Sequence, residues 1–427
     1  MKSIFHALLS ENNPKGPTEV NQRTVDNLAY TWFGRPNIVT NGDKYWVGGV
    51  KDGIQQVVEY NSVTDTKETY PIGHEFEEDD HNQAQILIRA SDNRLMFVYA
   101  GHNSNYIGVR ISTNPLDASS VGPVLLIDTT YLNSYPSPYQ ASNGNIFIFY
   151  RARAGSAFNE TRWQYVKSTD NGATWSAPTD LWYYPGFDRT NYLISYQDGN
   201  NIHFVGTPGN PEELNEDNLR PYHFVFNILT ETATNTAGGS ITLPITPSNA
   251  TLIFSNISGV ETTWILDVIT VAGVPRMLFV YFPNGNRTSG SKWKARYIYY
   301  AVWNGSTWVS EQLYAEQFGY IGKEFRANVT SKSYCGCPRF VTANPDLIII
   351  PKEDLTNNDY LKRRLELFKY DLRDKSEVQL TYNSEHDNWR PITSLTSKQN
   401  LLWIFTNDYV DFLRFDIKLK SATVDFS

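Results

Sequence analysis

Histidine is scarce in this chain of 427 residues, so the position of each of its 7 histidines is informative. His81 precedes the first strand of a predicted hairpin, and His102 follows the second strand of the same hairpin. Tyr135 and Arg151 occupy the equivalent positions around the next hairpin, and Tyr192 opens the one after it. The start of the first strand and the end of the second lie at the same end of an antiparallel pair. We therefore expect these five side chains to gather at one end of the fold.

These residue types suit cleavage of a uronic acid-containing chain by β-elimination. An arginine can neutralise the uronate carboxylate bidentately, which makes the neighbouring proton acidic enough to remove. A neutral histidine is a fitting base near neutral pH, and a tyrosine can protonate the departing oxygen. A nearby arginine would lower the pKa of the tyrosine, so that the tyrosine could also be the base. We predict His81, Tyr135 and Arg151 as catalytic residues.

Substrate contacts are predicted for a wider set of side chains around the same end of the fold. This set consists of His102, Tyr192, Asn82, Arg153 and His223. His223 could equally be a metal ligand. Hydrolysis would instead require two carboxylates that face the bond. Asp79 and Asp80 are the candidates, but adjacent residues of a strand point to opposite faces, so a role in bracing the turn before His81 is favoured.

The only cysteines, Cys335 and Cys337, open one predicted strand set, and His386 precedes the next set. Two thiols and one imidazole could contribute to a structural zinc site, although a full set needs four ligands. Buried thiols without a metal are the equal alternative. The predicted elimination chemistry requires no cofactor, and two cysteines do not make a disulfide framework.

The elements that must position these residues are short strands rich in Tyr, Phe, Ile and Val, separated by Asn-Gly and Asp-Gly turns. The first strand of each set begins near residues 38, 83, 137, 192, 263, 337 and 391. Units of about 45 to 74 residues with about four strands each are typical of propeller blades. We predict one all-β domain over residues 1–427, a seven-bladed β-propeller with four antiparallel strands per blade. Residues 1–30 are predicted to be an N-terminal extension or a blade-closing segment, and a pair of β-sandwiches is the alternative fold.

A sequence motif supports the propeller. Ser168–Trp175 has the form S-x-D-x-G-x-T-W of an Asp-box, whose Asp and Gly build a hairpin turn while the Trp packs into the blade edge. Trp303–Trp308 is a degenerate copy that keeps the turn residues and the aromatics. Both are predicted to be structural.

The composition limits the partners. The formal net charge is −8, without a basic block, so binding to nucleic acid or to an anionic membrane is not expected. A polyanionic substrate must therefore be held by local Arg and His. Residues 1–10 contain only a short apolar run, too weak for a secretory signal, and no stretch has the apolar length of a membrane span. We expect a secreted protein or a component of a phage virion.

The stretch Asp79-Asp80-His81-Asn82, followed by a hairpin and His102, resembles the BNR-repeat propeller family that includes the ulvan lyases. The resemblance continues through Ser134-Tyr135-Pro136, Tyr150-Arg151, the Asp-box and Asn191-Tyr192, and covers residues 30–230 best. It implies a polysaccharide lyase that acts on sulfated, uronic acid-containing algal polysaccharide. It also implies His81 and Tyr135 as base and acid in either order, with Arg151 at the carboxylate and with His102 and Tyr192 completing the site.

Three alternatives remain open. Long polar insertions in the second half depart from the family, so a bacterial capsule is an alternative substrate. A sialidase-like glycoside hydrolase also carries Asp-boxes, but Gly34-Arg35-Pro36 is only a faint match to its opening motif. A non-catalytic glycan-binding propeller, such as a phage receptor-binding protein, would keep the aromatic cleft without turnover.

Overall fold

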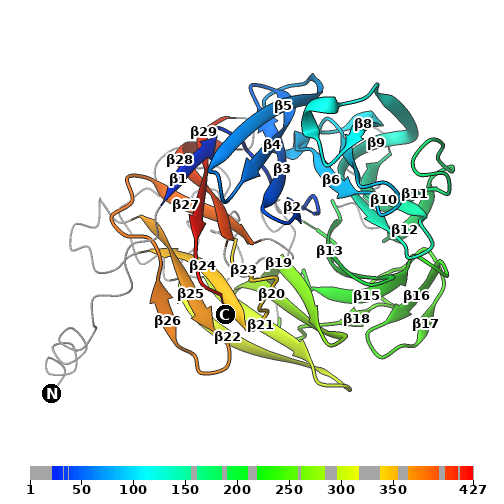
Figure 1. The fold of residues 1–427 in the computed structure, drawn as a ribbon. Helices are drawn as coiled ribbons and strands as arrows, with labels where there is room; N and C mark the ends of the chain where they lie inside the picture. Colours follow the sequence, from blue (N-terminus) through cyan, green and yellow to red (C-terminus); the bar gives the residue numbers. More distant parts are fainter. Residues whose placement is uncertain are drawn as a thin grey trace, which may run out of the picture.

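The computed structural model describes residues 22–31, 33–36, 38–154, 161–184, 190–209, 219–257, 261–283, 296–316, 337–353, 364–393, 400–411 and 414–426. In these residues the chain is almost entirely β-structure, with two short 3-10 helices, η1 (Asp80–Asn82) and η2 (Ala118–Ser120). Figure 1 shows the sheets arranged in a ring, with β2, β6, β13, β19 and β23 around its middle. The predicted all-β, propeller-like arrangement is confirmed.

The described strands pair into six antiparallel sheets. The first sheet contains β2 (Ile38–Asn41), β3 (Lys44–Lys51), β4 (Ile54–Asn61) and β5 (Thr66–Glu75). The second contains β6 (Gln85–Ile88), β7 (Arg94–Tyr99), β8 (Ser104–Pro115), β9 (Leu125–Gln140), β10 (Ile146–Arg153), β11 (Thr161–Ser168) and β12 (Thr179–Tyr183). The third contains β13 (Tyr192–Asp198), β14 (Asn201–Thr207), β15 (Tyr222–Asn227), β16 (Thr232–Asn235), β17 (Ser240–Ile241) and β18 (Thr251–Leu252).

The other three sheets have four strands each. One contains β19 (Thr262–Val271), β20 (Val274–Phe282), β21 (Arg296–Trp303) and β22 (Trp308–Glu316). The next contains β23 (Arg339–Phe340), β24 (Leu347–Glu353), β25 (Leu365–Asp371) and β26 (Glu377–Gln379). The last contains β27 (Asp387–Thr393), β28 (Asn400–Asp411), β29 (Arg414–Thr423) and β1 (Arg23–Asp26), so the two ends of the described chain share a sheet.

The long strand β9 joins two halves of the seven-stranded sheet. Its residues 125–133 pair with β8, whereas its residues 132–140 pair with β10. The strand therefore passes from the edge of one four-stranded group to the first position of the next. The hairpins expected from the sequence are otherwise found in register, for example β13 with β14 from Tyr192 opposite Thr207.

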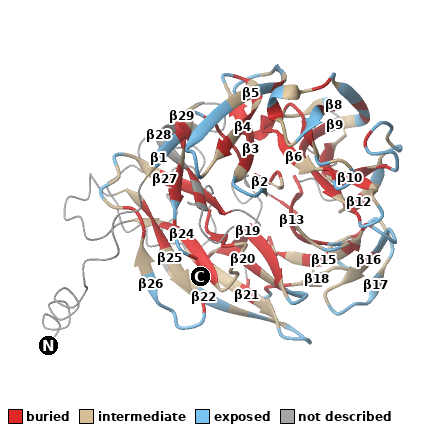
Figure 2. Ribbon diagram, viewed as in Figure 1, coloured by how far each residue is buried: buried red, intermediate tan, exposed pale blue. Residues whose placement is uncertain are grey.

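Local sequence explains the tight connections. Asp52 and Gly53, between β3 and β4, have φ of 52° and 73°, and Ala272 and Gly273, between β19 and β20, have φ of 49° and 78°. Positive φ at both central residues is the geometry of type I′ turns, whose twist suits two-residue hairpins. β19 and β24 are buried along most of their length, as Figure 2 shows, so the alternation of apolar and polar residues expected for a half-exposed strand is weak in their sequences.

The Asp-box connects β11 to β12, and its predicted structural role is confirmed. Asp170 accepts hydrogen bonds from Ser168 Oγ at 2.8 Å and from the backbone nitrogen of Thr174 at 2.9 Å. Gly172 has a φ of 89°, and a Cβ at this position would lie 2.4 Å from Met96. The degenerate copy makes the corresponding turn between β21 and β22, where Asn304 replaces the aspartate as acceptor.

The segment before β2 runs into the middle of the ring. Ala29 pairs with Val50 through both backbone hydrogen bonds, and the backbone nitrogen of Thr31 donates to Gln83 Oε1 at 2.7 Å. Farther along, Arg35 Nη2 lies 2.7 Å from Asp267 Oδ1 on β19. This lead-in segment, residues 29–31 and 33–36, thus contacts residues from different sides of the ring.

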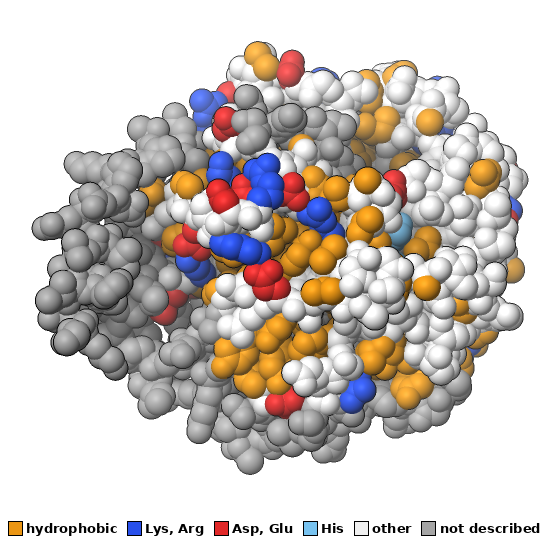
Figure 3. Space-filling view, turned by 90° about the horizontal axis from the view of Figure 1, so that it is seen from below, with side chains coloured by type: hydrophobic (Ala, Val, Ile, Leu, Met, Phe, Trp, Pro, Cys, Tyr) orange, Lys and Arg blue, Asp and Glu red, His pale blue; other side chains and the backbone are white. Residues whose placement is uncertain are grey.

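The outer surface carries mixed charge. Figure 3 shows a face on which Lys and Arg side chains lie beside Asp and Glu side chains. Ion pairs such as Arg276 with Asp346 and Lys352 with Glu377 have this character. No helix in the described part of the chain is long and apolar enough to cross a membrane.

Candidate active site

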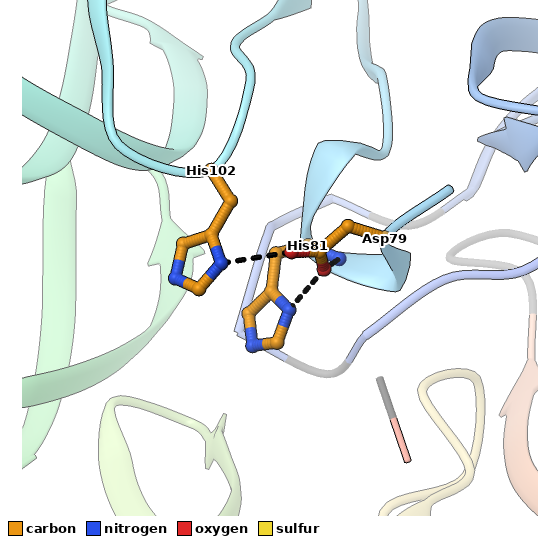
Figure 4. Close-up of side chains that lie close together, drawn as sticks. All are labelled: Asp79, His81 and His102. Carbon is orange, nitrogen blue, oxygen red and sulfur yellow. Dashed lines mark hydrogen bonds and ion pairs between the residues drawn. The ribbon is translucent and has the colours of Figure 1, made fainter. Parts of the chain in front are cut away.

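The turn before β6 holds His81 through a carboxylate. Asp79 is the N-cap of η1, and its Oδ1 accepts hydrogen bonds from the backbone nitrogen of His81 at 2.8 Å and from His81 Nδ1 at 2.5 Å. Its other oxygen, Oδ2, lies 2.8 Å from Nδ1 of His102, which follows β7. One buried carboxylate therefore bridges two histidines, as Figure 4 shows.

Asp79 fixes the tautomers of both rings. Burial alone would raise the pKa of Asp79, but His81 and the hydrogen bond from His102 hold it well below its usual range, so Asp79 is ionised. An ionised carboxylate only accepts hydrogen bonds, so each Nδ1 carries a proton. Arg151 Nη2 lies 3.4 Å from Nε2 of His102, and because a guanidinium only donates, that nitrogen is the acceptor. His102 is neutral, with its pKa lowered to about 4 by burial and by the neighbouring His81.

The two imidazole rings stack with their centroids 4.3 Å apart and an interplanar angle of 7°. In Figure 4 the Nδ1 atoms of His81 and His102 face Asp79, and the Nε2 atoms point away from it. When His81 is neutral, its Nε2 has a lone pair that can take a proton. Asp79, His81 and His102 also place one potential ligand atom each within 4.8 Å of one another, an arrangement that could hold a metal ion.

Tyr135 enters the site from a bulge in β9. Ser137 pairs with Phe149 and Ser134 pairs with Arg151, so Tyr135 and Pro136 together oppose a single residue of β10. Such a two-to-one bulge redirects a side chain. Tyr135 also has a φ of 57°, in the left-handed region that is rare for residues other than glycine.

The Tyr135 ring lies 5.3 Å from that of His81 between centroids. Its hydroxyl is buried and has no hydrogen-bond partner among the described residues. Burial raises the pKa of Tyr135 well above its usual value, and the nearby Arg151 offsets only part of this shift. Arg151 does act to lower the pKa of Tyr135, as expected, but desolvation outweighs its charge, so the expected net lowering of the tyrosine pKa is wrong for this structure.

Arg151, near the end of β10, lies beside two tyrosine rings. Its guanidinium carbon is 4.6 Å from the ring centroid of Tyr135 and 5.1 Å from that of Tyr192, distances typical of cation–π contacts. Ser134 Oγ accepts from Arg151 at 3.4 Å. The structure thus brings His81, His102, Tyr135, Arg151 and Tyr192 together, as the strand pattern indicates.

This five-residue group is mostly buried. The exposed fractions of His81, Tyr135, Arg151 and Tyr192 are 6%, 1%, 5% and 8%. His102 is the most open of the five, with 19% of its side chain exposed. Among these five described residues, His102 is therefore the one that a substrate can reach most easily from solvent.

Two of the other predicted contact residues, Asn82 and Arg153, lie next to the five-residue group. Asn82 is buried and braces the turns, since its Oδ1 accepts from the backbone nitrogen of His102 at 2.5 Å and its Nδ2 donates to Glu77 O at 2.8 Å. Arg153 is half-buried and lies two residues beyond Arg151, on the same face of β10.

His223 lies outside the group. It is fully buried on β15, where its Nε2 is 3.1 Å from His203 Nδ1 and its Nδ1 is 2.8 Å from Thr236 Oγ1. Both imidazoles are in the interior of the third sheet, and burial lowers the pKa of His203 to about 4 and that of His223 well below its usual value. Among the described residues His223 is therefore a fully buried core residue outside the five-residue group.

The predicted zinc ligands are only partly described. Cys335 lies outside the described residues, so this trio stays a prediction. Cys337 is fully buried, and the partly exposed His386 has its Nε2 3.6 Å from Glu385 Oε1.

Sequence reasoning missed two supports of the site. Phe33, in the lead-in segment, lies 5.3 Å from the Tyr135 ring and 4.7 Å from the Tyr192 ring between centroids. Arg390 of β27 donates to Asp80 Oδ2 at 2.7 Å and thereby ties η1 to the last sheet. Both contacts join residues that are far apart in the sequence. The opposite charges of Arg390 and Asp80 are the only sequence signal for the second contact, and the Phe33 contacts have none.

A curated ulvan lyase of Alteromonas sp. (strain LOR) is 25% identical over 283 residues, which cover 57% of this chain and 54% of that protein, so the chain matches about half the length of this relative. The fold is similar to that of a PL25 ulvan lyase bound to -[GlcA(1-4)Rha3S]-, with a TM-score of 0.66 and 16% identity over 97% of this chain and 96% of that chain. For the polysaccharide lyase Uly1 the TM-score is 0.61, with 12% identity over 97% and 100% of the two chains.

A more distant fold match is an oligogalacturonate lyase in complex with manganese, with a TM-score of 0.53 and 12% identity over 96% of this chain and 95% of that chain. At these identities the structural matches establish the fold alone. The model of the BNR repeat-containing family matches residues 39–315, more than half of the sequence. With this match and the propeller-like arrangement of its sheets, the chain belongs to the BNR repeat-containing family.

Proposed function

We propose that this protein is a polysaccharide lyase that cleaves a uronic acid-containing acidic polysaccharide by β-elimination. The observation that carries the proposal is the buried Tyr135 hydroxyl, which has no hydrogen-bond partner among the described residues and belongs to a ring that lies beside both His81 and Arg151. An unsatisfied buried hydroxyl costs about 1–3 kcal/mol, so its retention points to a partner that arrives with the substrate.

In the proposed reaction Arg151 pairs with the uronate carboxylate and stabilises the negative charge that develops on it. Nε2 of His81 removes the proton from the carbon next to the carboxylate, and the electron pair of that bond forms a carbon–carbon double bond. The bond to the glycosidic oxygen breaks, and the hydroxyl proton of Tyr135 moves to that oxygen. The raised pKa of Tyr135 keeps it protonated before the reaction, which favours Tyr135 as the acid and His81 as the base.

Asp79 has the supporting role in this mechanism. Its contact with His81 Nδ1 holds the tautomer in which Nε2 is unprotonated, and its charge stabilises the imidazolium that forms. His102 and Tyr192 would contact the sugar beside the carboxylate, and Arg153 would contact a neighbouring unit. No step in this scheme uses a metal or a cofactor.

The choice of polymer rests on the comparison with a solved relative. The sugar named for one solved relative, GlcA linked to sulfated rhamnose, makes an ulvan-like polysaccharide the first choice and a bacterial capsule the second. We place the activity outside the cell or on a virion, where such polymers occur. We also propose that the ring has seven blades, with β9 contributing the outer strand of the second blade and the inner strand of the third.

The test is incubation of the full chain with ulvan and with other uronate-containing polysaccharides, followed by the ultraviolet absorbance of the unsaturated uronate. The wild type should produce this signal, and His81→Ala and Arg151→Ala should reduce its rate at least about 100-fold. His74→Ala, at an exposed histidine of β5, is the matched control. Release of reducing ends without the absorbance would point to hydrolysis, and binding without either signal to a glycan-binding protein.

A further inference from the structure

The inner strands also line a cavity away from the five-residue group. The five-residue group lies where β6, β9 and β13 begin or bend, whereas residues farther along the same strands line a cavity of about 490 Å³. For example, Tyr192 of β13 belongs to the group, and Ser195 of the same strand lines the cavity. A cavity of this volume is within the range of small-molecule sites.

The lead-in segment separates the cavity from the five-residue group. Phe33 packs on Tyr135, whereas Arg35, two residues later, lines the cavity. Between them, a Cβ on Gly34 would lie 2.2 Å from Gln83 Nε2 and 2.3 Å from Gln85 Nε2, so this part of the channel is tightly filled. A ligand in the cavity would therefore be bound independently of the proposed catalytic residues.

The wall of the cavity carries two guanidinium groups around one carboxylate. Arg35 Nη2 is 2.7 Å and Arg339 Nη1 is 3.3 Å from Asp267 Oδ1, and the backbone nitrogen of Phe340 donates to Asp267 Oδ2 at 2.9 Å. Among the described residues that line the cavity, these are the charged side chains, so their sum is one positive charge. Guanidinium groups bind carboxylates in preference to neutral groups, especially where water is limited.

The remaining wall supplies hydroxyl groups. The Tyr139 hydroxyl and Ser195 Oγ are 2.7 Å apart, and Thr342 Oγ1 and Thr393 Oγ1 are 3.3 Å apart. Hydroxyl groups both donate and accept, so they match the hydroxyl groups of a sugar. Phe340 and other apolar side chains complete the lining.

We propose that this distal cavity, formed around Arg35, Asp267 and Arg339, binds a small sugar acid such as a free uronate. The carboxylate of the ligand lies against the two guanidinium groups, and its hydroxyl groups bond to the Tyr139–Ser195 and Thr342–Thr393 pairs. The site does not depend on lyase activity, since it shares no residue with the proposed catalytic group.

The test is calorimetric titration of the full chain carrying Arg151→Ala, which removes the guanidinium from the proposed catalytic site. Glucuronate should bind with one equivalent and a Kd of about 1 mM, while glucose and acetate should each bind at least about tenfold more weakly. Thr342→Trp in the same background fills the cavity without removing a charge and should abolish binding. Thr230→Trp, on an exposed turn, is the size-matched control and should bind as the parent does.

A second variant, Arg35→Gln, keeps a donor for Asp267 and should weaken glucuronate at least about tenfold, with folding checked by circular dichroism. Absence of glucuronate binding to the Arg151→Ala protein overturns the proposal. So does binding that survives both Thr342→Trp and Arg35→Gln, or acetate binding as tight as that of glucuronate. If the wild-type protein shows no lyase activity, these glucuronate-binding results still decide whether the distal cavity binds a sugar acid. The two proposals are therefore tested separately.

Discussion

The rings of His81 and His102 stack 4.3 Å apart, and a single carboxylate, Asp79, contacts the Nδ1 atom of each. Two imidazolium ions this close would repel each other, and the lowered pKa of His102 reflects burial and this neighbour. In the proposed mechanism His102 therefore stays neutral and contacts the substrate, while His81 is the base that accepts the proton.

Asp79→Asn is expected to remove most of the activity. An asparagine can present its NH₂ group to His81 Nδ1, which would favour the tautomer with a proton on Nε2 and so block the base. We expect kcat to fall at least about 100-fold, with the protein still folded. Initial rates from unsaturated uronate absorbance and a thermal melt measure the two effects. An unchanged kcat would show that Asp79 does not set the tautomer.

Tyr135→Phe is expected to lower the lyase activity and to raise the stability of the fold. It removes the proposed acid, so the rate should fall at least about 100-fold, but it also removes a buried hydroxyl without a described partner, so the unfolding free energy should rise by about 1 kcal/mol. Tyr139→Phe is the matched control, because it breaks a hydrogen bond to Ser195 and should cost about 1 kcal/mol without loss of activity. Urea unfolding and initial rates give both readings. A Tyr135→Phe protein that is active as the wild type would remove tyrosine from the mechanism.

Phe33→Leu tests whether the lead-in segment positions the tyrosines. Leucine keeps an apolar side chain of similar volume but loses the ring contacts with Tyr135 and Tyr192. We expect a stability loss of about 1 kcal/mol and a kcat lowered about tenfold with KM little changed, because the acid is displaced while carboxylate binding remains. A rise in KM at constant kcat would indicate that Phe33 supports substrate binding alone.

The buried pair His203 and His223 predicts a pH dependence of stability. The folded pKa of His203 is lowered to about 4 by burial, from about 6.5 in the unfolded chain. The unfolded state therefore binds more protons between these values, and stability is lost as pH falls from about 6.5 towards 4, by about 3 kcal/mol for this group. Urea unfolding at several pH values measures the slope. His203→Gln should flatten it, and an equal slope in wild type and variant would contradict this assignment.

Chelation tests the alternative use of Asp79, His81 and His102 as metal ligands. The proposed mechanism predicts that dialysis against a chelator leaves kcat unchanged. Excess zinc should inhibit, because a metal on Nδ1 of His81 would displace the proton that Asp79 holds there. Loss of activity on chelation, restored by one equivalent of metal, would instead make this group a catalytic metal centre.

Much of the framework could be predicted from strand and turn patterns. The spacing of hairpins located the strands that begin each set, because Asn-Gly, Asp-Gly and Asp-box turns are local signals, and the shared end of each hairpin placed His81, Tyr135 and Arg151 together. The sharing of β9 between two groups of strands could not be predicted, since the continuity of a long strand depends on tertiary pairing. The burial of His223 and the raised pKa of Tyr135 also depend on neighbours distant in sequence, which no local pattern encodes.

Elimination and hydrolysis give products of different mass, so the masses of the products test the proposed elimination most directly. Complete digestion of a defined uronate-containing oligosaccharide by the wild-type protein should give two fragments whose masses add up to that of the substrate, with no water gained. In ¹⁸O-labelled water, after subtraction of the exchange at reducing ends that is measured with purified products alone, neither fragment should carry the label. Fragments that together contain one added water, with the label incorporated at the cleaved bond, would contradict the account.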